Sequence, residues 1–555
     1  MYFIRSLFVA ILLFIVSFRK CLGQSDENPV VTIESGQIMG RKAYTVEENN
    51  EYYAFQGIPY AEPPLGNLRF RAPVKVSNWT GILNATTDGN ICVQDSSPVQ
   101  GQEDCLFVNV YTRNLTGTSS VMVWIYGGTF TAGDSAYESY GPDYLLDQGV
   151  VYVSFNYRVG VLGFLSTEDT VIPGNWGLKD QLLALQWVQN NIENFGGNAS
   201  DVTIFGESAG AASVSYLLLS NRTSGLYNKA ILQSGSSLCL WSLNRRARRI
   251  AFNIGLYLDI VTDNSSVLLN RLRQVDYETL QSTATTVSIT ITLENPLEGL
   301  FFSPVIEPAH VDAIVVGKSD ELLQNGAFNK VPVLLGFNSN EAAAVGAISD
   351  IVLLYLGTYD VAVQNLSPYD LSTSSLRRLL AGICIKYHYF GLLPISTQSD
   401  EVIEFISDDQ FNRPIRRMIQ SLAQDVTVYF YQFSYEGNLA GITNRNFTGV
   451  GHAEDVAYLF RIVSLENVNI TDTDKLVRSR MVKLWTNFAK YGNPTPTTDP
   501  LLENVVWEAV GTDPLDLDYL NINTTLTLQQ NPFEESMELY DDIYETYGNP
   551  PHDTY

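Results

Sequence analysis

Positive charge is scarce in this sequence. Only 34 lysines and arginines stand against 60 aspartates and glutamates, which gives a formal net charge of −26 at pH 7. Binding to nucleic acid depends on basic patches that neutralise phosphates, so nucleic acid is excluded as a partner. The same deficit disfavours contact with anionic membrane surfaces, and it indicates a soluble chain.

Linkers, repeats and low-complexity runs are missing before the last residues. A length of 555 residues would allow roughly three or four domains of typical size, but nothing in the composition marks a boundary. Hydrophobic residues make up 45% and charged residues 17%, which permits a large core and argues against disorder. We therefore expect one domain over residues 24–555. From about residue 532 the chain is acidic and tyrosine-rich, and we expect this C-terminal tail to be disordered.

Long apolar runs are missing except at the N-terminus. The run Ser6–Phe18 is shorter than the ~20 residues that a membrane-spanning helix needs. It fits a secretory signal peptide over residues 1–23, with small residues at Cys21 and Gly23 before the cleavage point. Two basic residues after the run are unusual there and leave an uncleaved anchor as the alternative. No other stretch predicts a membrane span, so no stable membrane anchor is expected.

Glycosylation sequons are numerous, and beside a signal peptide they predict a secreted, extracellular glycoprotein with a disulfide-permissive environment. The ten sequons begin at Asn78, Asn84, Asn114, Asn198, Asn221, Asn264, Asn365, Asn446, Asn469 and Asn523.

Cysteine is sparse, with five residues, of which Cys21 leaves with the predicted signal peptide. Cys92 and Cys105 are close enough in sequence to close a small loop in an oxidising compartment. Cys239 and Cys384 are either buried thiols or a second bridge, and the sequence does not choose between these.

Short apolar runs rich in β-branched residues predict buried parallel strands. The runs are Val121–Tyr126, Val150–Phe155, Val202–Phe205, Lys229–Gln233, Val331–Gly336 and Val426–Phe433. A helical stripe of apolar residues runs from Leu178 to Phe195. Alternating strands and helices predict an α/β fold, a mostly parallel twisted sheet with helices on both faces, in which chemistry lies beyond the carboxyl ends of the strands. The region 240–330 is more helical, and its basic cluster 245–249 is interpreted as a solvated helix face.

The motif that carries chemistry is Gly206-Glu-Ser208-Ala-Gly210, between an apolar strand and small helix-forming residues. This context predicts a nucleophile elbow, a tight turn that lifts the Ser208 hydroxyl above the sheet. Attack on a carbonyl also needs amide donors for the developing oxyanion. Ala209 offers one, and the glycines of Trp124–Phe130, which follows another strand, offer others.

Five segments resemble the type-B carboxylesterase and cholinesterase family, and insect esterases above all. They cover roughly residues 30 to 510 and are Tyr53–Phe70, Glu103–Tyr111, Asn175–Gln181, Phe195–Gly210 and Trp485–Pro494.

The resemblance implies the α/β-hydrolase fold, a Cys92–Cys105 disulfide, and an oxyanion hole formed by Gly128, Thr129 and Ala209. Thr129 departs from the glycine or alanine that is usual there. Its β-branched side chain would narrow the pocket or disfavour the required φ, while its amide survives.

A serine nucleophile needs a base, and histidine is the usual one. Of the four histidines, His452 lies in the glycine-rich loop Gly449–Asp455 after a predicted strand, and follows Ser208 and an acid in the order of this fold. His310, His388 and His552 lack such a context. The resemblance also points to His452.

The acidic third member of the catalytic triad is expected between Ser208 and His452 in the sequence, and directly after a strand. Glu341 satisfies this after Val331–Gly336, and the family pattern selects it from sixty acidic residues. It would fix the imidazole tautomer and stabilise the imidazolium. The resemblance assigns triad support to Ser234 and substrate-pocket roles to Glu207, Trp241 and Leu300.

These residues predict a serine carboxylesterase that acts on a small-molecule ester without metal or cofactor; the oligomeric state stays open. A juvenile hormone esterase is the main alternative. Such enzymes carry Gln where this chain has Glu207, although Gly449-x-x-His452-x-x-Asp455 matches their pattern. A cholinesterase is disfavoured because no tryptophan lies between Cys92 and Cys105 to bind choline. A non-catalytic adhesion-type member is disfavoured because all three triad residues are present.

Overall fold

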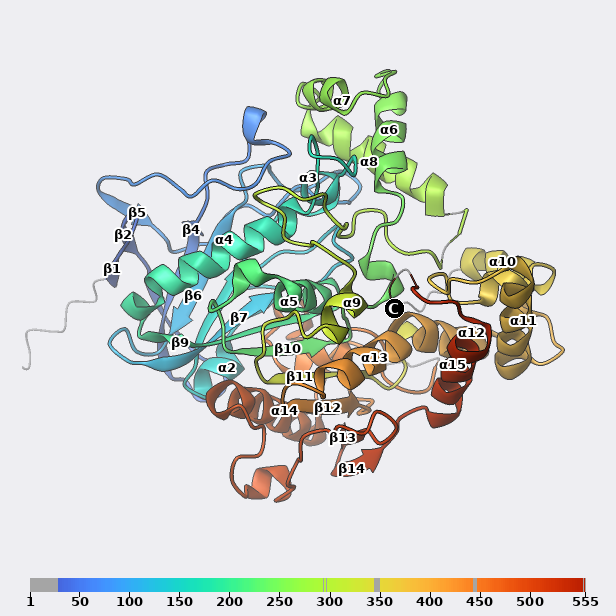
Figure 1. Cartoon of the computed structure of the whole chain (residues 1–555). Coiled ribbons are helices and arrows are strands. Elements are labelled where there is room, and N and C mark those ends of the chain that lie inside the picture. Colours follow the sequence, from blue (N-terminus) through green and yellow to red (C-terminus); the bar gives the residue numbers. More distant parts are fainter. Residues whose placement is uncertain are drawn as a thin grey trace, which may run out of the picture.

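The chain folds around a large mixed sheet (Figure 1) with the strand order β14-β13-β12-β11-β10-β9-β7-β8-β6-β4-β3. The computed structural model describes residues 28–292, 294–295, 297–343, 350–442, 447–552 and 554. The predicted signal peptide 1–23 and the sequon residue Asn446 lie outside these ranges. Strands β7 to β13 run parallel in the centre of the sheet, and antiparallel strands flank them at both edges.

The strands of this sheet are β3 (Arg41–Tyr44), β4 (Glu51–Pro59), β6 (Phe107–Thr112), β7 (Ser119–Ile125), β8 (Val151–Phe155), β9 (Gly197–Glu207), β10 (Lys229–Gln233), β11 (Val333–Asn338), β12 (Val428–Phe433), β13 (Asp518–Ile522) and β14 (Leu526–Gln530). A small second sheet contains β1 (Val30–Ile33), β2 (Gly36–Met39) and β5 (Ile82–Asn84).

The helices are α2 (Asp143–Asp147), α3 (Gly160–Phe164), α4 (Trp176–Asn191), α5 (Ala209–Leu219), α6 (Ala247–Tyr257), α7 (Ser265–Leu272), α8 (Tyr277–Thr292), α9 (Ser319–Gln324), α10 (Asp350–Gly357), α11 (Ser375–Ile385), α12 (Ser399–Ser407), α13 (Arg413–Leu422), α14 (Asp472–Tyr491) and α15 (Glu534–Tyr547).

All six predicted strands form, as β7 to β12, and the predicted fold class is confirmed. Strands β8, β10, β11 and β12 are buried along their whole length, since α4 and α5 cover one face of the sheet and α2 and α14 the other (Figure 1). Burial on both faces explains why these strands appear as continuous apolar runs rather than alternating ones. Strand β9 starts earlier than expected, at Gly197.

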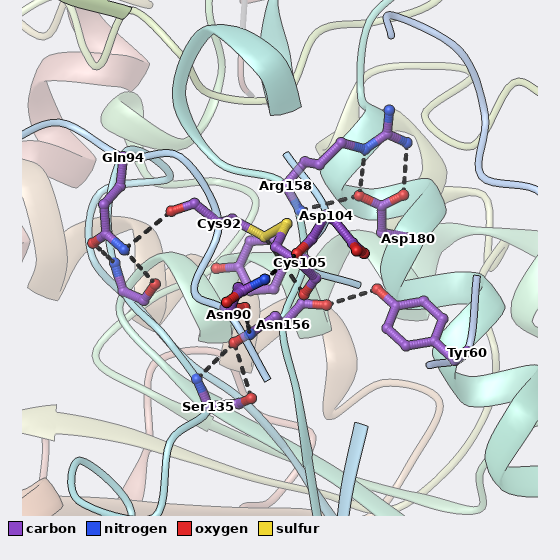
Figure 2. Close-up of a disulfide and its surroundings, with 12 residues drawn as sticks. Tyr60, Asn90, Cys92, Gln94, Asp104, Cys105, Ser135, Asn156, Arg158 and Asp180 are labelled. Atoms are coloured by element: carbon purple, nitrogen blue, oxygen red, sulfur yellow. Dashed lines mark hydrogen bonds and ion pairs between the residues drawn. A yellow bond between two sulfur atoms is a disulfide. The ribbon is translucent and has the colours of Figure 1, made fainter. Parts of the chain in front are cut away.

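The Cys92–Cys105 disulfide forms, with the two Cα atoms 4.9 Å apart, whereas Cys239 and Cys384 are free thiols. Figure 2 shows the disulfide and Gln94, which lies inside the disulfide loop. Gly133 N donates to Gln94 Oε1 over 3.0 Å, and Gln94 Nε2 donates to the Gly133 carbonyl over 3.4 Å. The disulfide loop therefore holds the glycine-rich segment that follows β7.

The basic cluster 245–249 is a solvated helix face in only one part. Arg248 and Arg249 are exposed on α6, as expected. Arg245 and Arg246 are half-buried and precede the helix. Arg245 donates to the Leu240 carbonyl over 3.0 Å, and Arg246 to that of Gly299 over 3.2 Å, so these two charges hold neighbouring loops instead of facing water.

The expectation of a disordered tail is wrong, because residues 534–547 form α15. Met537, Tyr540 and Ile543 of this helix are buried in a second hydrophobic cluster with residues of α11 and α12. Tyr544 adds a polar tie, since its hydroxyl accepts from Arg413 Nη1 and donates to Asp370, each over 2.7 Å. The acidic residues of the segment lie on the outer, exposed side of the helix.

One described stretch, Ser375–Thr397, has the length and mean hydropathy (1.3) of a membrane span, which the sequence had not predicted. It is not one straight helix. It begins as α11 and breaks at Gly391, which has φ +55°. Its inner side, with Ala381, Ile385 and Phe390, packs into the second cluster. The stretch lies on the fold as a bent surface element.

We predict that Met537→Ala lowers the free energy of unfolding by about 2–5 kcal/mol, because it removes a buried side chain that the surrounding cluster cannot fully replace. Glu538→Ala, its exposed neighbour, is the matched control and should change stability by less than about 0.5 kcal/mol. Chemical denaturation followed by circular dichroism measures both. Equal stability of the two variants would show that α15 is not packed in solution.

Candidate active site

Ser208 occupies a strained turn between β9 and α5. Its backbone angles are φ +58° and ψ −124°, a conformation that costs free energy and that surrounding contacts must enforce. The glycine at 210 is required here, since a Cβ atom on Gly210 would lie 2.0 Å from the Ile125 carbonyl oxygen of β7. The amide of Ser208 donates to the Gln233 carbonyl of β10 over 2.9 Å. The predicted elbow therefore forms, and the side chain lies at the carboxyl edge of the sheet.

His452 and Glu341 meet at the same edge. Glu341 follows β11 and His452 lies in the loop after β12. His452 Nδ1 is 2.6 Å from Glu341 Oε2, and the His452 amide donates to the Glu341 carbonyl over 2.9 Å. The structure thus joins His452 to Glu341 directly, and Ser208 follows β9 at the same carboxyl edge of the sheet.

Ser234 and Asn338 complete the surroundings of Glu341, which is fully buried. Glu341 Oε1 accepts from Ser234 Oγ over 2.6 Å and from the Asn338 amide over 2.7 Å. With Oε2 bound to His452, both carboxylate oxygens are engaged, as a buried carboxylate requires. Ser234 is therefore placed where the resemblance implied.

The second imidazole nitrogen faces Glu207. His452 Nε2 lies 3.2 Å from Glu207 Oε1, and within the described residues no hydrogen bond joins it to the Ser208 hydroxyl. Burial raises the pKa of Glu207, and the charge of His452 offsets part of this rise. For His452, burial lowers the pKa, but Glu207 and then Glu341 outweigh it and raise the pKa above its usual value. Two carboxylates therefore compete to stabilise one imidazolium.

The segment after β7 passes close to Ser208 and carries amides without partners. A Cβ atom on Gly127 would lie 3.0 Å from Ser208 Cβ. The amides of Gly128, Thr129 and Ala209 donate no hydrogen bond to any residue that the structure describes. For Ala209 this follows from its place in the first turn of α5, where amides have no partner within the helix.

Thr129 adopts φ +55°, the left-handed region that a β-branched side chain disfavours. Its hydroxyl donates to the Gly128 carbonyl over 2.8 Å and lies 2.8 Å from Thr131 Oγ1. These two local bonds offset part of the strain, and the side chain itself is exposed. The steric concern raised by the sequence is therefore a real feature of the backbone.

Trp241 is connected to His452 by ring contacts with Phe411, a residue that the sequence did not single out. The Trp241 ring centroid is 5.8 Å from that of Phe411, and Phe411 is 4.8 Å from the His452 ring. Phe411 belongs to a π-helical turn, Asp408–Asn412, and such turns often occur at functional sites. Leu300 is half-buried, next to Gly299, where a Cβ atom would lie 3.2 Å from Trp241 Cα. The role of Leu300 in the pocket stays a prediction.

Glu207 also lines an open cleft of about 570 Å³. Tyr140, Ala453, Val456 and Ile462 form part of its walls. The cleft joins an acidic group to apolar surface directly beside the imidazole.

A buried polar network beneath the triad also escaped the sequence analysis. Gln233 Nε2 donates to Asp455 Oδ2 over 2.7 Å, and Trp485 Nε1 donates to Gln233 Oε1 over 3.1 Å. Asn338 Nδ2 donates to the Gly451 carbonyl over 2.8 Å. The network anchors the His452 loop to β10, β11 and α14. The available signal was Asp455, in the pattern Gly449-x-x-His452-x-x-Asp455.

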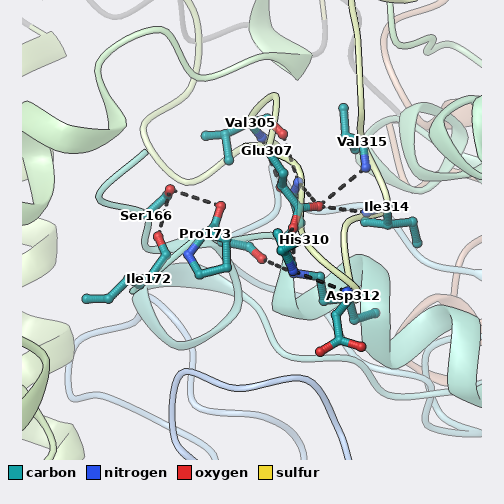
Figure 3. A network of polar contacts seen from close by, with 12 residues as sticks. Ser166, Ile172, Pro173, Val305, Glu307, His310, Asp312, Ile314 and Val315 are labelled. Atoms are coloured by element: carbon teal, nitrogen blue, oxygen red, sulfur yellow. Dashed lines mark hydrogen bonds and ion pairs between the residues drawn. The ribbon is translucent and has the colours of Figure 1, made fainter. Parts of the chain in front are cut away.

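The other histidines lie away from this site. His310 pairs with the buried Glu307 over 2.7 Å (Figure 3), and His388 lies 3.4 Å from Ser536 Oγ. His552 accepts from the Ser372 amide over 3.0 Å and is buried, although the sequence had placed it in a disordered tail. Within the described residues no group of three or more His, Cys, Asp and Glu is arranged to hold a metal ion.

The sheet, the elbow and the His–Glu pair define an α/β-hydrolase. A model of the carboxylesterase family matches residues 27–540, and the chain belongs to that family. Esterase FE4 of Myzus persicae is 34% identical over 551 residues, covering 94% of this chain and 93% of that protein. Juvenile hormone esterase of Tribolium castaneum is 34% identical over 546 residues, covering 92% of this chain and 90% of that protein.

A solved structure agrees with these relatives. The crystal structure of juvenile hormone esterase from Manduca sexta, with OTFP covalently attached, gives a TM-score of 0.83 at 30% identity. It covers 94% of this chain and 100% of that one. The predicted family is therefore confirmed, and this chain is a carboxylic ester hydrolase, so the non-catalytic alternative is set aside.

We predict that kcat/KM falls on acidification as a single group, His452, becomes protonated. The midpoint of this fall should lie above pH ~6.5, the usual pKa of histidine, because His452 must be neutral to accept a proton and its pKa is raised. Glu207→Gln removes the largest charge that raises this pKa, so the acid limb should move to lower pH by about one unit or more. Glu138→Gln, an exposed residue of the same cleft, is the control. An acid limb that stays in place in Glu207→Gln would contradict the assigned cause.

Proposed function

We propose that this esterase works through an acyl-enzyme on Ser208, with His452 as general base and Glu341 as its partner. The observation that carries the proposal is the 2.6 Å contact between His452 Nδ1 and Glu341, at the edge of the sheet where the strained turn presents Ser208. With Nδ1–H bound to Glu341, the lone pair of Nε2 is available to take the serine proton.

The reaction then proceeds in two steps. His452 Nε2 removes the Ser208 proton as Oγ attacks the ester carbonyl, and the imidazolium returns the proton to the departing alcohol. Water, deprotonated by the same nitrogen, hydrolyses the acyl-enzyme and releases the acid. In the resting arrangement Nε2 lies 3.2 Å from Glu207, so Glu207 competes with Ser208 for this nitrogen.

The oxyanion of each tetrahedral intermediate would bind the amides of Gly128, Thr129 and Ala209. Two observations support this role. These amides have no other hydrogen-bond partner in the described chain, and the segment that carries Gly128 and Thr129 lies close to Ser208. Such donors contribute up to ~10²–10³ in rate each, because they are fixed before charge develops.

The proposed enzyme is secreted. The disulfide supports this, and so do the positions of the sequons. Among the nine that lie in described residues, Asn198 and Asn523 are half-buried and the other seven are exposed. An exposed asparagine is accessible to the glycosylation machinery.

The natural ester is the finer question. Trp241 and Phe411 would form one wall of the pocket, and the cleft at Glu207 would receive the alcohol side of the ester. Juvenile hormone is the second candidate substrate, because juvenile hormone esterases are among the similar proteins. Aphid esterase FE4 has the same identity to the chain. Measuring kcat/KM for juvenile hormone and for simple aliphatic and aromatic esters separates a hormone esterase from a general carboxylesterase. A value for the hormone far above the values for the other esters favours the hormone as the substrate.

We predict that an organophosphate inactivates the enzyme by forming one covalent adduct on Ser208. Peptide mass mapping locates the adduct. Ser208→Ala should abolish labelling and lower kcat by more than about 10³-fold, because no other group replaces the nucleophile. Ser213→Ala, buried in the same helix α5, is the control and should remain labelled. Labelling of another serine, or activity in Ser208→Ala, contradicts the assignment.

We predict that Thr129→Gly changes the ratio of kcat/KM between bulky and small esters more than it changes stability. Glycine relieves the strain at φ +55° while two hydrogen bonds of the hydroxyl are lost, so the effects on stability oppose each other. Thr129→Ala retains Cβ and the strained φ, and it separates pocket width from backbone strain. An unchanged ratio in both variants would show that Thr129 does not shape the pocket.

A further inference from the structure

A second cleft has a volume of about 650 Å³. Its walls come from the loop 68–74, the loop 170–176 that leads into α4, the end of α7 at Leu269 and Arg273, and the loop 310–312. None of the residues that line it belongs to the triad, the oxyanion segment or the Glu207 cleft. Its volume is in the range of sites that bind small molecules.

Two arginines in this cleft have no carboxylate partner among the described residues. Arg71 is exposed and forms no hydrogen bond or ion pair there. Arg273 donates from Nε and Nη2 to the Arg69 carbonyl over 3.0 and 2.9 Å. Arg69 itself is neutralised by Glu103. Burial, then Arg71 and then Arg69 lower the pKa of Arg273, which indicates that the positive charges repel one another. This concentration of uncompensated positive charge is unusual in a chain of net charge −26.

The acidic groups beside the cleft are already engaged. Glu307 is buried and accepts from Lys179 Nζ over 2.6 Å and from the Ile314 amide over 2.9 Å. His310 lies between this cluster and the cleft (Figure 3), and Asp312 and Pro173 line the same cleft. His310 Nδ1 accepts from the Asp312 amide over 3.2 Å, and His310 Nε2 lies 2.7 Å from Glu307. Both ring nitrogens are therefore engaged, and Asp312 lies 3.9 Å from Arg222.

Among the other lining residues, Leu68, Pro73, Val74 and Val171 are apolar and at least partly exposed, whereas Phe70, Trp176 and Leu269 are buried. A cleft with two guanidinium groups that lack a carboxylate partner, and with apolar residues beside them, suits a ligand with one anionic head and a hydrocarbon chain. Guanidinium groups bind carboxylate and sulfate through paired hydrogen bonds. A polyanion is disfavoured, because the rest of the surface would repel it.

We propose that this cleft is a binding site for an amphiphilic monoanion, with its carboxylate or sulfate head on Arg71 and Arg273 and its alkyl chain against the apolar wall. The acid released by hydrolysis of a long-chain ester and the headgroup of an anionic lipid share this chemistry. The proposal stands on the cleft alone and does not depend on the roles of Ser208, His452 and Glu341.

The experiment is calorimetric titration of the full-length enzyme with decanoate and decyl sulfate below their micelle concentrations. Both should bind, while acetate, which lacks the chain, and decyltrimethylammonium, which has the opposite charge, should not. Arg71→Gln should weaken binding by roughly tenfold or more, because it removes a charge-assisted contact without breaking any contact of the folded chain. Arg273→Gln should weaken it similarly. Arg271→Gln, an exposed arginine of α7 that does not line the cleft, is the matched control and should bind as the unmodified enzyme does.

Several outcomes overturn the proposal. Binding that survives both Arg71→Gln and Arg273→Gln would place the ligand elsewhere, for example in the pocket at Ser208. Equal binding of decyltrimethylammonium would show a non-specific apolar effect. Sedimentation with vesicles that contain phosphatidic acid distinguishes the sources: vesicle binding without binding of monomeric decanoate would make the surface a lipid contact rather than a site for a soluble anion. Unfolding temperatures of all variants identify any loss caused by misfolding of Arg273→Gln, and Arg71→Gln then decides.

Discussion

The buried carboxylate of Glu341 is the contact on which the arrangement of the catalytic edge depends. A carboxylate taken out of water is tolerated only when hydrogen bonds replace its hydration. Here the donors are Ser234 after β10, Asn338 at the end of β11 and His452 after β12. Because they come from three neighbouring strands, satisfying this one group fixes three loops relative to each other. The hydrogen bonds that the buried Glu341 carboxylate needs therefore orient the His452 imidazole before any substrate binds.

The turn that carries Ser208 is constrained by steric crowding rather than by hydrogen bonds to a buried charge. The backbone of α5 approaches β7 so closely that position 210 has no room for a side chain. At this point Ser208 has its unusual backbone conformation, and the Ala209 amide is without a partner in the described chain. The disulfide loop supports that segment through Gln94. Thr129 shows that the segment keeps its left-handed backbone even where the residue opposes it, which indicates that the surroundings are stiff.

The sequence could predict what is encoded locally. The six central strands, α4 and the elbow each depend on residues within a short window, and all of them form. The choice of Glu341 among sixty acidic residues needed the family pattern as well. The network of Gln233, Asp455 and Trp485 could not be predicted, because residues 222 and 252 positions apart have to meet. The same applies to Phe411, which reaches His452 only through a π-helical turn.

The C-terminal helix was misjudged for a different reason: its acidity dominated the composition, although Met537, Tyr540 and Ile543 already had a helical spacing. Its position has a consequence for biogenesis. Domains form in the order in which the ribosome delivers their residues. The surface of α11 and α12 that α15 covers is therefore complete only when residues 534–547 have emerged. Until then this apolar surface is exposed, and it would be the natural contact for a chaperone of the compartment in which the chain is made.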